Sequence, residues 1–153
     1  MKLRTKIDQI LGKTLVLIMS LMVINVLWQV FSRFFLGEPS SFTDELARYL
    51  MIWIGILGAA YVAGKNKHVA IDFFPKRLST NMQAKLLFAV RIIVILFCLF
   101  AMVIGGFRLV YITHILDQYS PALQIPLAWV YMCIPISGLL IIYYKITDIL
   151  YRN

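Results

Sequence analysis

Four apolar runs set the pattern of this sequence, and charged or turn-forming residues bound each of them. The runs cover residues 14–32, 49–63, 92–107 and 127–144, and none contains Asp, Glu, Lys, Arg or His. Uncharged apolar runs of about 20 residues are long enough to cross the hydrocarbon core of a bilayer as helices. With their flanking turns, the runs predict transmembrane helices at about residues 5–35, 43–63, 81–111 and 126–149.

Short connections place neighbouring helices antiparallel. We therefore expect a single all-α integral membrane domain over residues 1–153, with four transmembrane helices in an up-down antiparallel bundle. The helix over residues 81–111 alone would measure about 46 Å, at a rise of about 1.5 Å per residue. Because this exceeds the thickness of a bilayer core, the long helices must tilt or protrude.

The composition agrees with a membrane protein. Hydrophobic residues make up 61% of the chain, charged residues make up 14%, and the mean hydropathy is +0.85. A soluble domain is rarely so apolar. The formal net charge of +8 could indicate a nucleic-acid partner. The basic residues lie between apolar spans and not on a solvated face, however, so we expect no nucleic acid among the partners.

The basic residues also indicate the orientation of the helices. Eleven of the fifteen Lys and Arg residues lie in the N-terminus, in residues 65–85 and in the C-terminus. By the positive-inside rule these three segments are cytoplasmic, so both termini are expected inside the cell. The first apolar run is longer than the core of a signal peptide, and no A-x-A-like site follows it, so we expect an uncleaved helix.

The second helix begins with a charged cluster. Ser41 and Thr43 can cap its N-terminus, and the carboxylates of Asp44 and Glu45 suit the positive end of the helix dipole. Glu45 lies three residues before Arg48, so the two can form an ion pair on the helix surface. Direct contact between this cluster and a partner subunit is the alternative role.

Polar residues also predict how the first helix packs on the second. Arg33 closes the first helix, and antiparallel packing would bring it within reach of Glu45 or Asp44 across the turn. Asn25, Gln29 and Ser32 fall on one face by helical spacing. Polar side chains in lipid seek partners on neighbouring helices, so we expect hydrogen bonds between helices from this face.

Small residues recur along the second helix. Gly55, Ala59 and Ala63 repeat every four residues, which predicts a seam where another helix approaches closely. Whether Gly55 and Ala59 pack inside the bundle or against another subunit stays open at this point. Trp53 falls near the middle of the helix and is expected to anchor packing, whereas Leu57 is expected to face lipid.

Prolines and aromatic residues mark the fourth helix. Pro126 suits its first residue, because the missing N–H of proline has no partner at that position. Pro135 lies inside the helix and should kink it about one turn upstream. Trp129 at one end, and Tyr143 and Tyr144 at the other, are expected in the aromatic belts of the membrane.

Chemistry that a catalyst or an autonomous transporter needs is missing from the apolar runs. A self-sufficient small transporter is an alternative, but it would keep ionisable groups in its core, and Arg91 lies where it can extend outward. A membrane redox enzyme is a weaker alternative, because Cys98 and Cys133 stand alone in separate helices. His68 and His114 fall on opposite sides of the membrane and so cannot ligate one haem. We expect no cofactor, no metal and no enzyme activity.

Several motifs carry a family resemblance: Arg33-Phe34 with Gly37, SFTDELARY at residues 41–49, Trp53, Gly58-Ala59, HVAID at 68–72, SPALQIP at 120–126, Trp129, Tyr131 and Pro135. Their order and spacing over nearly the whole chain resemble the small membrane subunit of tripartite ATP-independent periplasmic (TRAP) transporters. The match implies a four-helix subunit in the bacterial inner membrane.

What the resemblance further implies is a system of three parts. A periplasmic binding protein delivers an organic anion such as a sialic acid, another sugar acid or a C4-dicarboxylate. A large membrane subunit moves the anion with a sodium gradient, and the small subunit packs on it as a scaffold among membrane lipids and helps to dock the binding protein.

Fourteen residues are expected to contact the partner subunits or to support the structure. His68 is expected at the membrane interface, and Asp72 either anchors the cytoplasmic loop or is solvated. The residues are Arg33, Asp44, Glu45, Arg48, Trp53, Gly55, Ala59, His68, Asp72, Ser120, Pro121, Pro126, Trp129 and Pro135.

Overall fold

The computed structural model describes residues 2–37, 40–65 and 80–151, and this part of the chain is helical apart from its connections. α4, η3 and α5 follow one another without interruption and are called the α4–α5 rod below. The elements in chain order are α1 (Lys2–Phe31), the π-helical turn η1 (Ser32–Leu36), α2 (Ser41–Gly64), α4 (Thr80–Phe97), the π-helical segment η3 (Cys98–Ile104), α5 (Gly105–Ile115), α6 (Leu127–Tyr131) and α7 (Cys133–Tyr151).

The predicted fold class is confirmed. Four helices in the described residues are long and apolar enough to span a membrane. These candidate spans are Leu3–Phe35, Ser41–Gly64, Lys85–Ile115 and Leu127–Leu150. They agree with the predicted helices to within a few residues, except that the third continues about one turn further, to Ile115.

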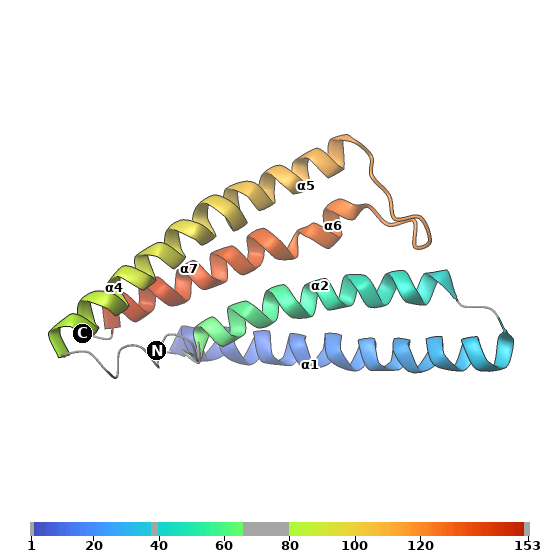
Figure 1. Ribbon diagram of the computed structural model, residues 1–153, viewed down its shortest axis with the longest axis horizontal. Helices are drawn as coiled ribbons and strands as arrows, with labels where there is room; N and C mark the ends of the chain where they lie inside the picture. Colours follow the sequence, from blue (N-terminus) through green and yellow to red (C-terminus); the bar gives the residue numbers. More distant parts are fainter. Residues whose placement is uncertain (1, 38–39, 66–79, 152–153) are drawn as a thin grey trace.

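The helices alternate in direction along the chain, and two ends of the molecule result. α1 begins and α7 ends at the same end, which we call the terminal end; it holds Arg4, Gly64 and Asp148 (Figure 1). The opposite end, called the loop end, holds residues 40–45 and 116–126. Whether the terminal end faces the cytoplasm stays a prediction from the basic residues.

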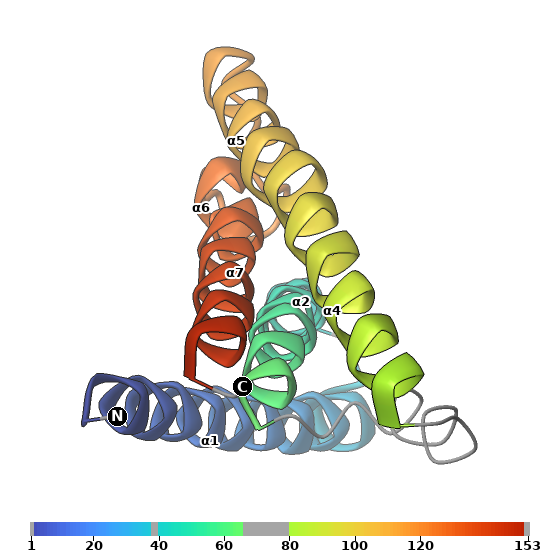
Figure 2. The ribbon, with the colours of Figure 1, turned by 90° about the vertical axis from the view of Figure 1, so that its left-hand side faces the viewer.

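The antiparallel helices do not stay side by side over their whole length, because their axes diverge from one end of the molecule to the other (Figure 1). α1 and α2 lie side by side, and α7 packs on α2 and on η3. α2 lies in the centre when the molecule is viewed from the terminal end, with α1, α7 and the α4–α5 rod around it (Figure 2). α1 therefore packs chiefly on one helix, and much of its surface is left for lipid or for a partner.

The interior is a small apolar cluster where α1, α2, η3 and α7 meet. Trp53 is partly buried against it, as expected of a packing residue. Its buried members are Leu11, Leu57, Ala60, Ala63, Cys98 and Ile141.

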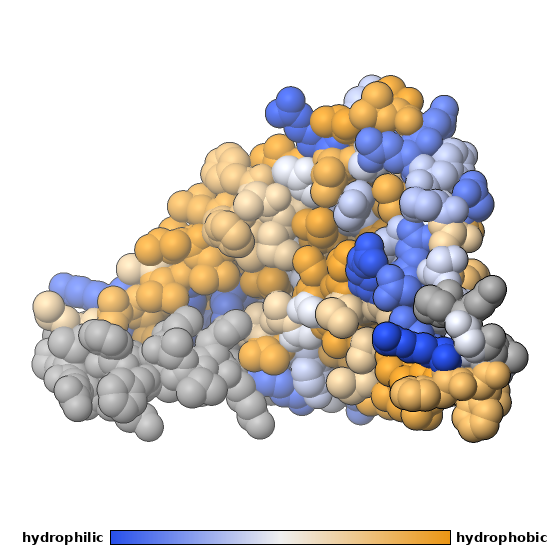
Figure 3. Space-filling model, turned by 45° about the vertical axis from the view of Figure 1, so that its right-hand side comes forward, coloured by the Kyte–Doolittle hydropathy of each residue, from blue (hydrophilic) through white to orange (hydrophobic). Residues whose placement is uncertain are grey.

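Most of the exterior is apolar, as a lipid-facing surface requires. Leu27 on α1, Phe97 on α4 and Phe100 on η3 each expose more than half of their surface. In the view of Figure 3, hydrophobic residues cover the flank along the α4–α5 rod, and hydrophilic residues gather toward the loop end. This distribution fits helices that cross a bilayer.

Two glycines allow a close crossing between the α4–α5 rod and α7. A Cβ atom on Gly138 would lie 2.8 Å from the Cβ of Met102, and one on Gly106 would lie 3.0 Å from the Cδ of Pro135. Both distances are too short for a side chain without a shift of the neighbour. Small residues here let two backbones approach, which is how helices associate in lipid.

The predicted kink at Pro135 is confirmed. α6 ends at Tyr131 and α7 begins at Cys133, so the helix is interrupted one turn before the proline. Pro135 has no N–H to donate to the Tyr131 carbonyl, and its ring crowds that carbonyl. Pro126 is the N-cap residue of α6 and not its first helical residue, so the helix begins one residue later than predicted.

The predicted side-chain cap of α2 is wrong. The helix begins at Ser41, so Ser40 is the N-cap residue, and its side chain makes no capping bond. Thr43 already lies in the first turn, and its hydroxyl donates to the carbonyl oxygen of Ser40 at 2.9 Å. A threonine inside the turn faces carbonyls and not free N–H groups, which explains the difference.

Candidate partner-binding site at the two ends of the bundle

At the loop end, the carboxylate of Glu45 collects three hydrogen bonds. The Tyr49 hydroxyl donates to it at 2.8 Å, and the backbone N–H groups of Ala122 and Leu123 donate at 2.8 and 3.0 Å. Hydrogen bonds to an ionised acceptor are among the stronger ones in proteins. Glu45 therefore ties the first turn of α2 to a loop 77 residues further along the chain.

That loop, residues 116–126, is also closed by its own backbone. Ser120 N–H donates to the Ile125 carbonyl and Leu127 N–H to the Gln118 carbonyl, at 3.0 and 2.9 Å. The fully buried hydroxyl of Ser120 accepts the Leu123 N–H at 3.2 Å. With both ends and its middle bonded, the loop has one defined shape, and Pro121 is exposed on it.

The expected partners of Glu45 are wrong. Arg48 pairs with Asp44, at 2.9 Å, and not with Glu45. Arg33 is exposed, and in the described part of the chain it pairs with neither carboxylate. The reason is that the Glu45 side chain turns toward the loop, where backbone N–H groups need an acceptor, whereas the side chains of Asp44 and Arg48 are both more than half exposed. An exposed pair of this kind contributes only about 0 to 1 kcal/mol.

The polar face of α1 does bond to α2, as predicted. Asn25 donates from its side-chain amide to the Thr43 carbonyl at 2.7 Å, and Gln29 donates to Asp44 at 3.4 Å. Ser32 instead donates to the carbonyl of Gln29 in its own helix. Asn25 is buried, so its bond fixes the register of α1 against the start of α2.

The terminal end holds a polar cluster that the sequence pattern did not reveal. Arg4 forms an ion pair with the buried Asp148 at 2.7 Å and donates to the Gly64 carbonyl at 2.5 Å. The Tyr144 hydroxyl donates to Asp8 at 2.6 Å. α1, the end of α2 and the end of α7 are thus bonded to one another at this point.

Two more cations belong to this cluster. Arg91 donates to the Asp148 carbonyl at 3.3 Å, so it turns toward α7 and does not extend outward as expected. Lys145, one of the basic residues counted in the C-terminal segment, is also buried here. The sequence does contain one indication of this cluster. Asp8 and Asp148 are single acidic residues beside otherwise basic helix ends, and the predicted topology brings these two ends to the same side of the membrane.

Tyr144 is fully buried, so its predicted place in an aromatic belt is wrong. Its ring lies against Gly64, where a Cβ atom would come within 2.7 Å of the ring carbon Cζ. The guanidinium of Arg4 lies 5.5 Å from the ring centroid. Packing against glycine and a cation, together with the bond to Asp8, holds the ring inside the protein.

The predicted small-residue seam is divided between two environments, because Ala63 is buried in the core whereas its other two members are not. Gly55 and Ala59 are exposed, and nothing within the described chain approaches a Cβ atom built on Gly55. Ala60 and Ala63 are the small residues in the core, and Leu57, expected to face lipid, is buried with them. The repeat of four was recognised correctly, but it cannot say which face of the helix the chain itself covers.

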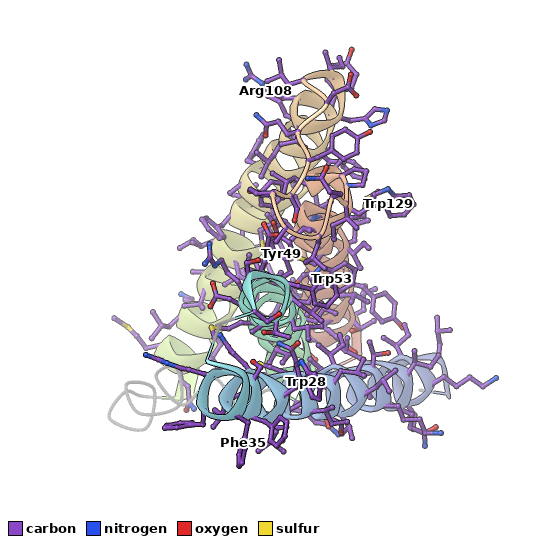
Figure 4. The ribbon with its side chains drawn as sticks, turned by 90° about the vertical axis from the view of Figure 1, so that its right-hand side faces the viewer. Trp28, Phe35, Tyr49, Trp53, Arg108 and Trp129 are labelled. Carbon is purple, nitrogen blue, oxygen red and sulfur yellow. The ribbon has the colours of Figure 1, made fainter. Side chains whose placement is uncertain are left out.

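The remaining predicted residues are spread over the molecule. Trp53 points toward the space between α2 and the α6–α7 pair, whereas Trp129 projects away from the protein (Figure 4). Ser120 and Pro135 are buried. The predictions for His68 and Asp72 lie outside the described residues.

The described residues offer structural contacts more than reactive chemistry. No three His, Cys, Asp or Glu side chains among them gather where they could hold a metal ion. Cys98 and Cys133 are both buried free thiols. The class that these features define is a multi-pass membrane protein that keeps charges out of its apolar runs and presents apolar helix faces, with a fixed loop at one end.

Comparisons with known proteins give the family. Residues 22–152 match the family described as the DctQ component of tripartite ATP-independent periplasmic transporters. The chain is 24% identical over 132 residues to the sialic acid TRAP transporter small permease protein SiaQ of Vibrio cholerae, which covers 86% of this chain and 75% of SiaQ. It is 31% identical over 144 residues to the ectoine TRAP transporter small permease protein TeaB of Halomonas elongata, covering 88% and 71%.

A further relative is a longer protein. The sialic acid TRAP transporter permease protein SiaT of Haemophilus influenzae is 29% identical over 108 residues, which cover 71% of this chain and 17% of SiaT. The chain belongs to the family of TRAP transporter small permease subunits. It is therefore a subunit of a membrane transporter and not an enzyme.

Proposed function

We propose that this chain is the scaffold subunit of a sodium-coupled, binding-protein-dependent TRAP transporter that imports organic acids across a bacterial inner membrane. The similarity to SiaT carries the proposal, because 108 residues of this chain match a segment that makes up 17% of that permease. A segment of this kind inside a larger permease chain indicates that the two parts work in contact. Here the larger part would be a separate subunit.

The distribution of charge favours a scaffold subunit over a chain that transports substrate by itself. Pathways for ions or charged substrates are built from ionisable side chains or interrupted helices near the middle of the membrane. The apolar runs of this chain carry no charged residue, and the described charges that are buried lie at the terminal end. On this proposal the large subunit supplies the pathway for substrate and sodium.

The exposed face of α2 is the surface that we assign to the large subunit. Gly55 and Ala59 are exposed there, with Met51 beside them. Among the described residues, a Cβ atom on Gly55 or on Gly58 would meet nothing within 4 Å, so a partner helix could approach the backbone closely. Trp129, exposed on α6, would provide an aromatic contact at the loop end.

The loop end is the surface that we assign to the periplasmic binding protein. Glu45 and Ser120 hold residues 116–126 in one shape, so their exposed side chains are ordered before a partner arrives. A preordered surface loses less entropy on binding. Pro121 on the loop, and Arg33 and Arg48 on the neighbouring helices, are exposed at this end.

The substrate class follows from the relatives in part. One relative is named for sialic acid and another for ectoine, and both compounds carry a carboxylate. The class that we propose is therefore organic acids, including sialic acids, other sugar acids and C4-dicarboxylates. The identity of the compound depends on the binding protein.

The test is reconstitution into liposomes. This chain, its large subunit and the binding protein are combined singly and together, and uptake of a radiolabelled organic acid is followed with and without a sodium gradient. The proposal predicts uptake only when all three are present and only with sodium. Uptake by this chain alone would establish the self-sufficient transporter instead, and uptake by the large subunit without this chain would remove the scaffold role.

A further inference from the structure

A groove lies between residues 5–20 of α1 and the end of α2, and it begins at the terminal end. Its volume is about 780 Å³. Thr5, Asp8 and Lys13 lie on its polar side, and Val16 and Leu17 follow along α1. The groove therefore changes from polar to largely apolar over about three turns of helix, toward the middle of the membrane. Ser20 ends the lining, and its hydroxyl donates to the Val16 carbonyl.

The floor of the groove is the ring of Tyr61 opposite Gly12. Gly12 on α1 lies next to this ring, since a Cβ atom built on it would be in van der Waals contact with Tyr61 at 3.5 Å. Arg4 ties α1 to the end of α2 through the Gly64 carbonyl, and Asp8 ties α1 to α7 through the Tyr144 hydroxyl, so both helices are fixed at this end. The groove is thus a built feature and does not depend on one flexible side chain.

The groove has a surplus of positive charge at its polar end. Lys13 comes from α1 and Lys65 follows the end of α2, and both are exposed. The ammonium group of Lys65 lies 5.4 Å from the centre of the Tyr61 ring, which keeps it over the groove. The one carboxylate in the lining, Asp8, already accepts the Tyr144 hydroxyl.

The depth of these groups matches a phospholipid. Lys13 is the last charged residue before the uncharged run 14–32, so it stands at the boundary between the polar and apolar layers. Val16 and Leu17 lie about one turn deeper and are mostly exposed. A ligand with an anionic head and an apolar tail satisfies both parts at once, whereas a soluble anion would leave the apolar part uncovered.

We propose that this groove binds one anionic phospholipid, with its phosphate between Lys13 and Lys65 and an acyl chain along Val16 and Leu17. A lysine near an anionic lipid head raises affinity about fivefold, so the pair provides about 25-fold selectivity over a zwitterionic lipid. The bound lipid would fill the gap that the described residues of α1 and α2 leave open. This proposal stands apart from the choice of transported substrate.

The test uses the purified complex with its large subunit, stripped of lipid and titrated with phosphatidylglycerol or phosphatidylcholine under native mass spectrometry. The double variant Lys13→Gln/Lys65→Gln should lower phosphatidylglycerol affinity about 25-fold and leave phosphatidylcholine binding unchanged. Lys85→Gln is the matched control, because Lys85 is an exposed lysine near the start of α4 and outside the groove.

A second pair of variants tests the apolar part. Val16→Trp keeps both lysines but fills the groove, so it should weaken phosphatidylglycerol binding, whereas Leu27→Trp, an exposed α1 residue outside the groove, should not. Equal losses in the double variant and in Lys85→Gln would show general surface attraction and overturn the proposal. Cross-links from residue 16 to the large subunit in place of lipid would overturn it in favour of a protein interface.

Discussion

Gly64 is the residue at which the packing of the terminal end can be tested most directly. The substitution Gly64→Ala places a Cβ atom 2.7 Å from Cζ and 2.9 Å from both Cε atoms of Tyr144. The ring is fully buried and bonded to Asp8, so it cannot turn aside without losing that bond. Extra atoms in a well-packed region cost about 1 to 3 kcal/mol.

Gly55→Ala is the matched control on the same helix. A Cβ atom there meets nothing within 4 Å in the part of the chain that the structure describes, so only the gain in helix propensity, up to about 1 kcal/mol, is expected. The difference between the two variants therefore includes the clash with Tyr144 and the gain in helix propensity at Gly55. We expect Gly64→Ala to be less stable than Gly55→Ala by about 1 to 4 kcal/mol.

The assay is unfolding of the purified chain in mixed micelles, repeated in a Tyr144→Leu background. A double-mutant cycle then measures the coupling between residues 64 and 144. With the ring removed, Gly64→Ala should cost nothing beyond the control. Equal stability of Gly64→Ala and Gly55→Ala, or a cost that persists without the ring, would refute the close contact between α2 and α7.

Three further predictions concern other parts of the molecule. Glu45→Gln should increase proteolysis and hydrogen exchange in residues 116–126, because the ionised acceptor of the Ala122 and Leu123 N–H groups is lost. Asp44→Asn should not have this effect, and equal exchange in both variants would argue against the bonds between Glu45 and this loop. Asp148→Asn should destabilise the chain by about 1 to 3 kcal/mol, since it removes the charge that balances Arg4 and leaves that guanidinium only its neutral contacts, such as the Gly64 carbonyl. Arg4→Gln/Asp148→Asn should recover part of the loss in the same unfolding assay, and a double variant no better than Asp148→Asn would contradict this. Cysteines placed at Ser40 and Gln118 should react with an impermeant thiol reagent from the periplasm, and one placed at Lys6 should not. Labelling of the Lys6 variant in intact cells would show that the chain has the opposite orientation to the one predicted.

The number and length of the helices could be predicted because lipid imposes one simple rule. Every backbone polar group in the bilayer must be bonded within its own helix, so an uncharged run of membrane length has only one structure. The break before α7 was equally predictable, since Pro135 removes a donor wherever it stands in a helix. Both predictions use information within one segment.

The partners of individual side chains were not predictable in the same way. Glu45 has Arg48 nearby in sequence and Arg33 across a turn, yet it bonds to backbone groups near residue 122. The sequence around Glu45 gives no information about which distant N–H groups need an acceptor. The cluster of Arg4 and Asp148 joins residues 144 positions apart, and only the folded topology brings them together. Leu57 and Gly55 show the same limit, because the period of a helix does not fix which face its neighbours cover.

The π-helical segment Cys98–Ile104 sets the angular phase between the two halves of its helix. A π turn holds more residues than an α turn, and each residue of an α-helix advances the chain by about 100°. The loss of one residue from this segment would restore an ordinary helix and rotate α5 by about a quarter turn relative to α4. Gly106 would then swing away from Pro135, and bulkier side chains would meet α7 in its place. The α4–α5 rod contacts α7 through α4 and α6 through α5. The number of residues in the π-helical segment, more than their identity, therefore allows both contacts at once.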